Sequence, residues 1–227
     1  MKNLFYIFIV MLFPFFANAQ EESHDEENQK EKKHLDIFHE IGINGTSLLS
    51  QFLNFSDKIT PQSPYFLTYK IGAKKHALRF GAGATFKESE KSVETFDDTE
   101  TIKDLTLDWR VGYEFRIKVG DRWLGYFGAD FIYTQSDKEQ INDSGFDVVT
   151  IGEYKSGIGG GPVIGLQFYL TPKLLLGTEG AFYFSEVESR SSTTFANFPE
   201  FNTEAEIVKD KELISTLPAT IYLIFHF

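Results

Sequence analysis

The clearest hydrophobic pattern in the chain runs from Leu105 to Ile117. Every odd-numbered residue in this stretch is apolar, and every even-numbered residue is polar, charged or glycine. Successive side chains of a strand point to opposite faces, so the alternation predicts a β-strand with one apolar and one charged face. A strand that turns apolar side chains to lipid and polar side chains to a lumen has this pattern. At about 3.3 Å per residue the segment reaches about 43 Å, which crosses a hydrocarbon core of about 30 Å even when tilted.

Seven more segments alternate in the same way, which predicts an all-β fold of about 8 strands. They are residues 37–46, 65–73, 78–86, 123–133, 158–170, 174–184 and 213–227. Short turns at 74–76, 119–122 and 171–173 alternate with long connections at 47–63, 87–104, 135–153 and 186–210. This alternation of lengths is typical of an up-and-down antiparallel transmembrane β-barrel, with short periplasmic turns and long extracellular loops.

Charge and proline positions add detail to this prediction. The predicted loops 87–104, 135–153 and 186–210 are strongly acidic, whereas the short turns are rich in lysine and arginine. We therefore expect one acidic rim and one basic rim. Pro162 and Pro218 lie inside predicted strands, where each removes a donor from the hydrogen-bond ladder. A β-bulge near either proline would accommodate it, and the glycines that precede Pro162 favour one there.

The alternation also predicts which charged side chains face the lumen. Nine residues share this face: Glu40, Lys70, Arg79, Asp108, Arg110, Glu114, Arg116, Asp130 and Glu179. An eight-stranded barrel has an interior just wide enough for side chains to fill, and charges buried there must pair. Because acids and bases are nearly balanced, we expect a plug of ion pairs that closes the lumen. The same charges could instead line a narrow ion path.

The N-terminus has the features of an export signal. A lysine precedes an apolar run of about 13 residues, and the small residues Ala17 and Ala19 follow as a cleavage pattern. We predict a signal peptide at 1–19, a charged and disordered periplasmic tail at 20–36, and the barrel at 37–227. The run is too short for a comfortable membrane anchor helix. Export to the cell outer membrane is the expected localisation.

Composition excludes several classes of function. Without Lys2 the chain keeps 21 basic and 33 acidic side chains, a net charge of −12, which disfavours nucleic acid as a partner. Cysteine is absent, so disulfides and thiolate chemistry are excluded. The histidines show no zinc-ligand spacing, and we expect no metal or cofactor. A hydrolase at the outer rim would need a histidine there. Since His39, His76 and His226 map to the periplasmic end, we expect no enzymatic activity.

Two segments in the last third carry a family resemblance. The chain ends in Phe227, and the apolar residues Ile221, Leu223 and Phe225 precede it at every second position. This ending resembles the signal read by the Gram-negative barrel-assembly machinery. The stretch 161–174 resembles the penultimate hairpin of small outer-membrane β-barrel proteins of the OmpA/OmpX-like class. The resemblance implies eight antiparallel strands, an outer-membrane location, contact with lipid and lipopolysaccharide, and long surface loops. It implies no conserved active site.

Three functions fit these observations. The first is a non-enzymatic outer-membrane barrel that stabilises the envelope or binds a surface partner through its acidic loops. The second is a small pore or transporter for ions or small solutes. The third is a soluble exported barrel that binds a lipid-like ligand, which would place apolar residues inside and charges outside. We expect the first, because the predicted strands place charges inside.

Overall fold

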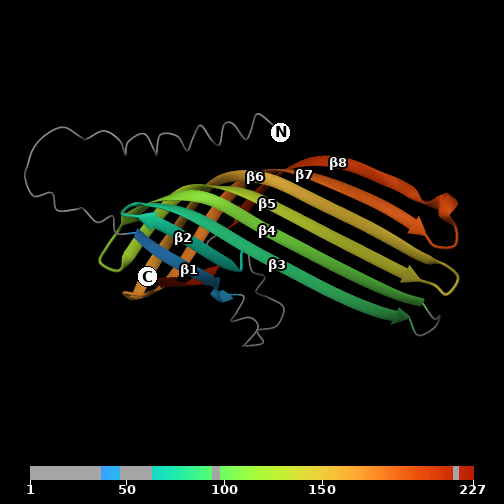
Figure 1. The fold of residues 1–227 in the computed structure, drawn as a ribbon, viewed down its shortest axis with the longest axis horizontal. Coiled ribbons are helices and arrows are strands. Elements are labelled where there is room, and N and C mark those ends of the chain that lie inside the picture. Colours follow the sequence, from blue (N-terminus) through green and yellow to red (C-terminus); the bar gives the residue numbers. More distant parts are fainter. Residues whose placement is uncertain (1–36, 47–62, 94–97, 217–219) are drawn as a thin grey trace, which may run out of the picture. The chain divides into compact units, whose positions relative to one another are not determined.

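The computed structural model describes residues 37–46, 63–93, 98–216 and 220–227, which belong to one compact unit of the chain, Leu35–Phe227. These residues form nine antiparallel β-strands and a short 3-10 helix, η1, at Pro199–Phe201 (Figure 1). The strands are β1 (Ile37–Asn44), β2 (Leu67–Ala73), β3 (His76–Val93), β4 (Asp98–Lys118), β5 (Trp123–Asp143), β6 (Val148–Thr171), β7 (Leu174–Phe195), β8 (Thr203–Thr216) and β9 (Ile221–His226). The all-β, antiparallel prediction is confirmed. The predicted leader and tail lie outside the described residues.

Hydrogen bonds between strands close the sheet into a ring. Strands β1 to β7 pair in sequence order, β7 also pairs with β9, and β9 pairs with β1. Strand β8 pairs with the part of β7 that lies beyond the β7–β9 ladder, from Ala181 onward. The last predicted strand, 213–227, is therefore two strands, and Pro218 between them lies outside the described residues.

The side chains that face into the ring are those that the alternation predicted to face inward. On β4, Trp109 is 53% exposed, whereas its neighbour Arg110 is 4% exposed. The same contrast recurs on β7, where Phe182 is exposed and Tyr183 is buried. Tight turns follow the predicted positions: Lys74–Lys75 links β2 to β3, and Pro172–Lys173 links β6 to β7. No helix in the described part of the chain is long and apolar enough to cross a membrane.

The prediction of long loops is wrong for three segments, because most of each segment is β-strand. Strands β3 to β8 continue through much of 87–104, 135–153 and 186–210, in paired arms that Figure 1 shows extending side by side. We name this part the distal sheet; it comprises residues 84–93, 98–106, 134–143, 148–157, 185–195 and 203–215. The hydrophobic alternation stops over most of this part because both faces are mostly polar, but the backbone ladder continues. The fourth predicted loop, 47–63, lies almost entirely outside the described residues.

Pro162 does not produce the bulge that its neighbouring glycines suggested. Gly160 pairs with Phe184 and Val163 pairs with Ala181, so the register of β6 with β7 is the same before and after the proline. On the other side of the strand, Pro162 pairs in register with Ala129. The missing donor is thus accommodated by a local break in one ladder. The register shift in the β6–β7 pair lies at Tyr169/Thr171 instead.

Candidate functional site

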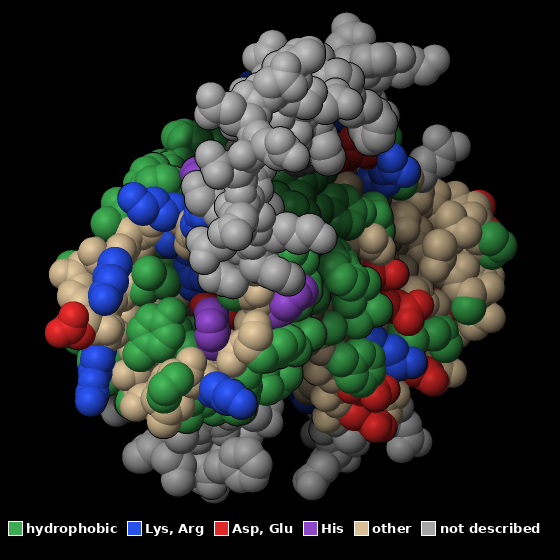
Figure 2. Space-filling model, turned by 60° about the vertical axis from the view of Figure 1, so that its left-hand side comes forward, with side chains coloured by type: hydrophobic (Ala, Val, Ile, Leu, Met, Phe, Trp, Pro, Cys, Tyr) green, Lys and Arg blue, Asp and Glu red, His purple; other side chains and the backbone are tan. Residues whose placement is uncertain are grey.

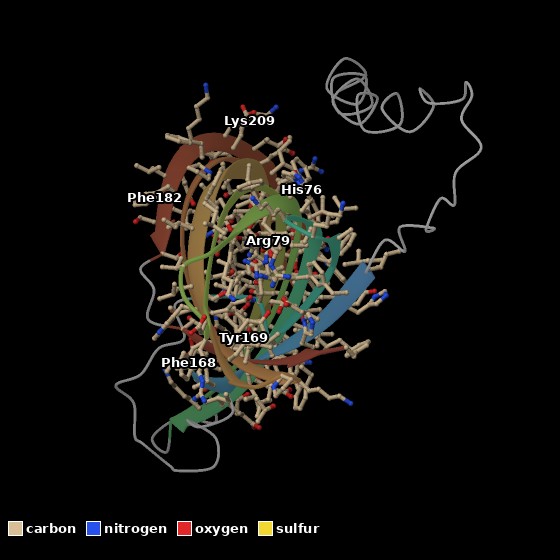
Figure 3. The ribbon with its side chains drawn as sticks, turned by 90° about the vertical axis from the view of Figure 1, so that its left-hand side faces the viewer. His76, Arg79, Phe168, Tyr169, Phe182 and Lys209 are labelled. Carbon is tan, nitrogen blue, oxygen red and sulfur yellow. The ribbon has the colours of Figure 1, made fainter. Side chains whose placement is uncertain are left out.

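The nine charged residues predicted to face the lumen are all buried inside the ring, none more than 7% exposed. They come from six strands: Glu40 on β1, Lys70 on β2, Arg79 on β3, Asp108, Arg110, Glu114 and Arg116 on β4, Asp130 on β5 and Glu179 on β7. Figure 3 shows Arg79 inside the ring among nitrogen and oxygen atoms of other side chains, and Phe182 on the outside. Side chains far apart in the sequence therefore meet in one place.

Two arginines and two carboxylates form the half of this cluster nearer the distal sheet. Arg79 Nη2 donates to Glu179 Oε2 at 2.6 Å, and Arg79 Nε lies 3.2 Å from Asp130 Oδ1. Arg110 Nη1 donates to Glu179 Oε1 and lies 3.7 Å from Asp130 Oδ2. Each arginine thus contacts both carboxylates. Charge-assisted hydrogen bonds of this kind are stronger than neutral ones.

The other half of the cluster lies nearer the C-terminal end of the chain. Lys70 Nζ donates to Glu114 Oε2 at 2.8 Å, and Arg116 Nη2 donates to Glu40 Oε1 at 2.5 Å. Arg116 Nε lies 3.3 Å from Glu114 Oε1. Arg79 Nη1, 3.6 Å from Glu114 Oε2, links the two halves. The eight side chains form one charge-balanced network of four cations and four carboxylates.

Asp108 is the one predicted residue that stays outside this network. Its Oδ1 accepts a hydrogen bond from Thr134 Oγ1 at 2.8 Å, and among the described residues no cationic side chain forms an ion pair with it. It lies where the ring meets the distal sheet, two residues before Arg110 on the same face of β4.

Uncharged side chains complete the network, and the charge pattern alone did not assign them to it. Tyr126 donates to Glu179 Oε2 at 2.9 Å, Tyr183 donates to Asp130 Oδ2 at 2.7 Å, and Gln167 accepts from Arg116 at 2.8 Å. Aromatic rings also cover cations: Arg110 lies over Tyr65, and Arg116 over Phe38, each 4.3 Å from the ring centroid. Tyr126, Tyr183 and Gln167 share the inward parity of their strands, and that signal could have identified them.

Glycines make room for these large side chains. A Cβ atom added to Gly165 would overlap the ring of Tyr126, and one added to Gly81 would lie 2.5 Å from Nε of Arg110. Both approaches are far closer than carbon packing allows. The tyrosine and the arginine each occupy the space that a neighbouring side chain would need. The interior is therefore filled by fitted polar side chains.

The outside of the ring is apolar. Every strand of the ring carries large hydrophobic residues that are more than a third exposed. We name this set of residues the apolar belt. It comprises Ile37, Ile41, Leu67, Leu78, Phe80, Phe86, Leu105, Trp109, Ile117, Trp123, Phe127, Phe131, Ile158, Ile164, Leu166, Leu170, Phe182, Phe184, Ile221 and Phe225. Figure 2 shows hydrophobic side chains spread widely over one face of the molecule.

No protein-family model, curated protein or solved structure matches this chain.

The three histidines in the described residues lie at the end of the ring that also holds the short basic turns. His226 Nδ1 lies 3.2 Å from Glu40 Oε1, His39 hydrogen-bonds to Tyr69 at 2.8 Å, and His76 hydrogen-bonds to Tyr113. Among the described residues, no group of three or more histidine, aspartate or glutamate side chains is placed to hold a metal ion. These histidine contacts join neighbouring strands at the end of the ring.

The four residues of the proposed assembly signal lie at the C-terminal end of the sheet. Ile221, Leu223 and Phe225 are on β9, and Phe227 follows it. Ile221, Phe225 and Phe227 are exposed on the outside, and the backbones of Phe227 and His39 exchange two hydrogen bonds at 2.8 and 3.0 Å. The terminal phenylalanine is thus attached to β1.

Phe86 and Leu105 of the apolar belt lie at the base of the distal sheet, and most of its other outward side chains are polar. On its outer face Arg190 donates to Glu188 Oε1 from Nε at 3.0 Å and from Nη2 at 2.7 Å. These hydrogen bonds hold the pKa of the Glu188 carboxyl below its usual range. Lys209 on β8 lies 3.6 Å from the other oxygen of Glu188. At the tip, Asp147 accepts from the backbone of Asn197 at 2.8 Å, which joins the β5–β6 turn to the β7–β8 connection.

Proposed function

We propose that this chain is an outer-membrane β-barrel protein that stabilises the envelope or binds a surface partner through the distal sheet. The observation that supports this proposal is the reversed distribution of polarity. Charged side chains fill the interior, and the apolar belt covers the outside of the same strands. Soluble proteins expose scattered apolar residues, but a continuous belt of this size is typical of a surface that contacts lipid or protein.

The closed ring also suits a bilayer. Backbone groups in hydrocarbon must find partners within the protein, and a ring of paired strands leaves no open edge. In the described residues the β1–β2, β1–β9 and β7–β9 ladders close the ring around most of the apolar belt, and the belt residues Phe86, Phe182 and Phe184 lie just beyond these ladders. Beyond these ladders the sheet is open, and most of the outward side chains there are polar.

We infer an orientation from the two ends. The short turns carry Lys74, Lys75, Arg122 and Lys173, all exposed, and would face the periplasm. The distal sheet would stand outside the cell, where its acidic residues could contact lipopolysaccharide or its counterions. Insertion by the barrel-assembly machinery belongs to the same proposal.

The ion-paired interior favours a closed barrel over a pore. A conducting pore needs a continuous water column along its axis. Arg79, Arg110, Glu179 and Asp130 instead contact one another across the ring, with distances of 2.6 to 3.7 Å where no water fits between the groups. A structural or surface-binding role therefore fits the geometry better than solute transport.

Membrane extraction tests the proposal directly. The full chain is produced in a Gram-negative host, and the isolated envelope is washed with alkaline carbonate. We expect the protein to stay in the pellet, to dissolve only in detergent, and to migrate differently on a gel before and after boiling. A soluble periplasmic protein is the control for release. Release by carbonate, or purified protein that stays monodisperse without detergent, would contradict the proposal.

A further inference from the structure

The distal sheet ends in two open edges. Beyond Gly83, β3 pairs only with β4, and β8 pairs only with β7, among the residues that the structure describes. Figure 1 shows β3 and β8 along the two opposite margins of the extended strands. Every residue from Ala84 to Lys91, and from Ala205 to Ser215, is exposed, so neither edge is covered on either face. Open edges of this length present unpaired backbone donors and acceptors that can bind another strand.

The charges on the two edges are complementary on both faces. On the outer face, β3 has two glutamates, Glu88 and Glu90, and β8 has two lysines, Lys209 and Lys211. On the inner face the signs are reversed, because β3 has Lys87 and Lys91, and β8 has Glu206, Asp210 and Glu212. The faces follow from the ladders: Phe86 pairs with the outward Leu105, and Leu213 pairs with the outward Phe184.

We propose that β3 of one molecule pairs antiparallel with β8 of a second copy of this chain. The register that we infer places Phe86 opposite Leu213, Lys87 opposite Glu212, Glu88 opposite Lys211 and Glu90 opposite Lys209. It joins three pairs of opposite charge and covers two apolar side chains that are 64% and 63% exposed. Directly opposed pairs of this kind are the interactions that stabilise a sheet.

Slips by one residue oppose like charges, and a slip by two residues in either direction separates Phe86 from Leu213. A shift by one residue in one direction places Lys87 opposite Lys211 and Glu88 opposite Asp210. A shift by one residue in the other direction places Glu88 opposite Glu212 and Lys91 opposite Lys209. Like charges directly opposite each other destabilise a sheet, and a one-residue slip also exchanges the two faces. Charged edges with this pattern reject most strands and accept a complementary one.

A second copy fits these edges better than the other edge of the same molecule. Strands β1 and β2 stand between β3 and β9 in the ring, so β3 and β8 leave the ring already separated. Two copies inserted in one membrane share one orientation, in which β3 of one and β8 of the other run antiparallel. This inference goes beyond the proposed function, because it assigns a partner to the edges of the distal sheet.

Cysteine cross-linking tests the pairing, since the chain has no cysteine of its own. One tagged copy carries Ser89→Cys, and a second copy with a different tag carries Asp210→Cys; these positions are opposite in the inferred register. Both are produced in the same cells, and the envelope is treated with a mild oxidant. We expect a disulfide-linked dimer that contains both tags, because opposed residues in a sheet are close enough to bridge.

The matched control replaces Asp210→Cys by Asp137→Cys, another exposed aspartate, which lies on the outer face of the central strand β5. It should give little mixed dimer. Equal yields from the two partners would mean random collision and would overturn the proposal. No mixed dimer, or a disulfide found only within one chain that carries both Ser89→Cys and Asp210→Cys, would overturn it as well.

Charge reversal gives a second test that does not use cysteine. We expect Lys211→Glu to weaken dimer formation in detergent by roughly tenfold, because one attractive pair becomes repulsive. Adding Glu88→Lys to the same chain should restore the dimer. Sedimentation gives the dimer fraction, and the gel shift on boiling verifies that each variant is folded. A folded Lys211→Glu variant that dimerises like the parent would contradict the register, as would a failure of Glu88→Lys to rescue.

Discussion

At the scale of the residue, a few charged side chains that form ion pairs with one another organise the interior of the ring. Arg79 contacts Glu179, Asp130 and Glu114, which come from three different strands. The residues Arg79 and Glu179 are 100 positions apart in the chain. Parity predicted that both face inward, but only the closed sheet brings them to 2.6 Å. A buried charge that loses its partners is strongly destabilising.

Removing the central arginine tests this dependence. We expect Arg79→Met to lower the free energy of unfolding by about 3–5 kcal/mol, because three buried carboxylates lose a partner. Adding Glu179→Gln should recover part of the loss, since one of those carboxylates becomes neutral. Unfolding by urea in detergent micelles, followed by the gel shift on boiling, measures the change. Lys138→Met in the distal sheet is the control, with an expected change within about 0.5 kcal/mol. An Arg79→Met variant as stable as the parent would mean that the network contributes little.

On the outer face of the ring, we expect an added charge to destabilise the protein. Trp109 lies near the middle of the apolar stretch of β4 and points outward, 53% exposed. We expect Trp109→Arg to cost about 2–4 kcal/mol when the protein is folded in a bilayer, because a charge is placed in hydrocarbon. Trp109→Phe is the matched control and should have a small effect. If Trp109→Arg inserts and unfolds like the parent, Trp109 does not face lipid.

At the scale of the element, the strands are longer than their hydrophobic pattern. Strand β6 runs from Val148 to Thr171, although alternation identifies only 158–170. In the first part of β6, Thr150, Tyr154 and Glu153 keep the ladder with polar side chains on both faces. Periodicity detects a strand only where one face is apolar, so the sequence predicted loops there. The distal sheet became visible only from the pairing of neighbouring strands.

The glycines of β6 give a test at this scale. Gly165 lies against the ring of Tyr126, whereas a Cβ atom added to Gly152 in the distal sheet would have Ser192 Oγ as its nearest neighbour, at 3.4 Å. We expect Gly165→Ala to destabilise the protein by about 1–3 kcal/mol, because Tyr126 must move and lose its hydrogen bond to Glu179. Gly152→Ala should be nearly neutral. Thermal unfolding of the two variants in the same detergent gives the comparison. Equal melting temperatures would show that the interior is not closely fitted at Gly165.

At the scale of the whole molecule, the filled interior predicts that the protein does not conduct. We expect purified protein in planar bilayers to give no discrete current steps, because the ion-paired side chains occupy the axis of the ring. A general porin, added under the same conditions, verifies that insertion and recording work. Reproducible single-channel steps from the parent protein would contradict the closed interior and favour the pore interpretation.

The sequence by itself determined the strand faces, because alternation of side chains is a local property of an extended backbone. It predicted the turns at Lys74 and Lys173 and the inward position of all nine charged residues. Tertiary structure decided the rest. Which arginine meets which carboxylate, why Asp108 stays apart from the network, and how far the strands extend all depend on register between segments distant in the chain. Register is fixed by pairing and packing across the sheet, and no single strand contains that information.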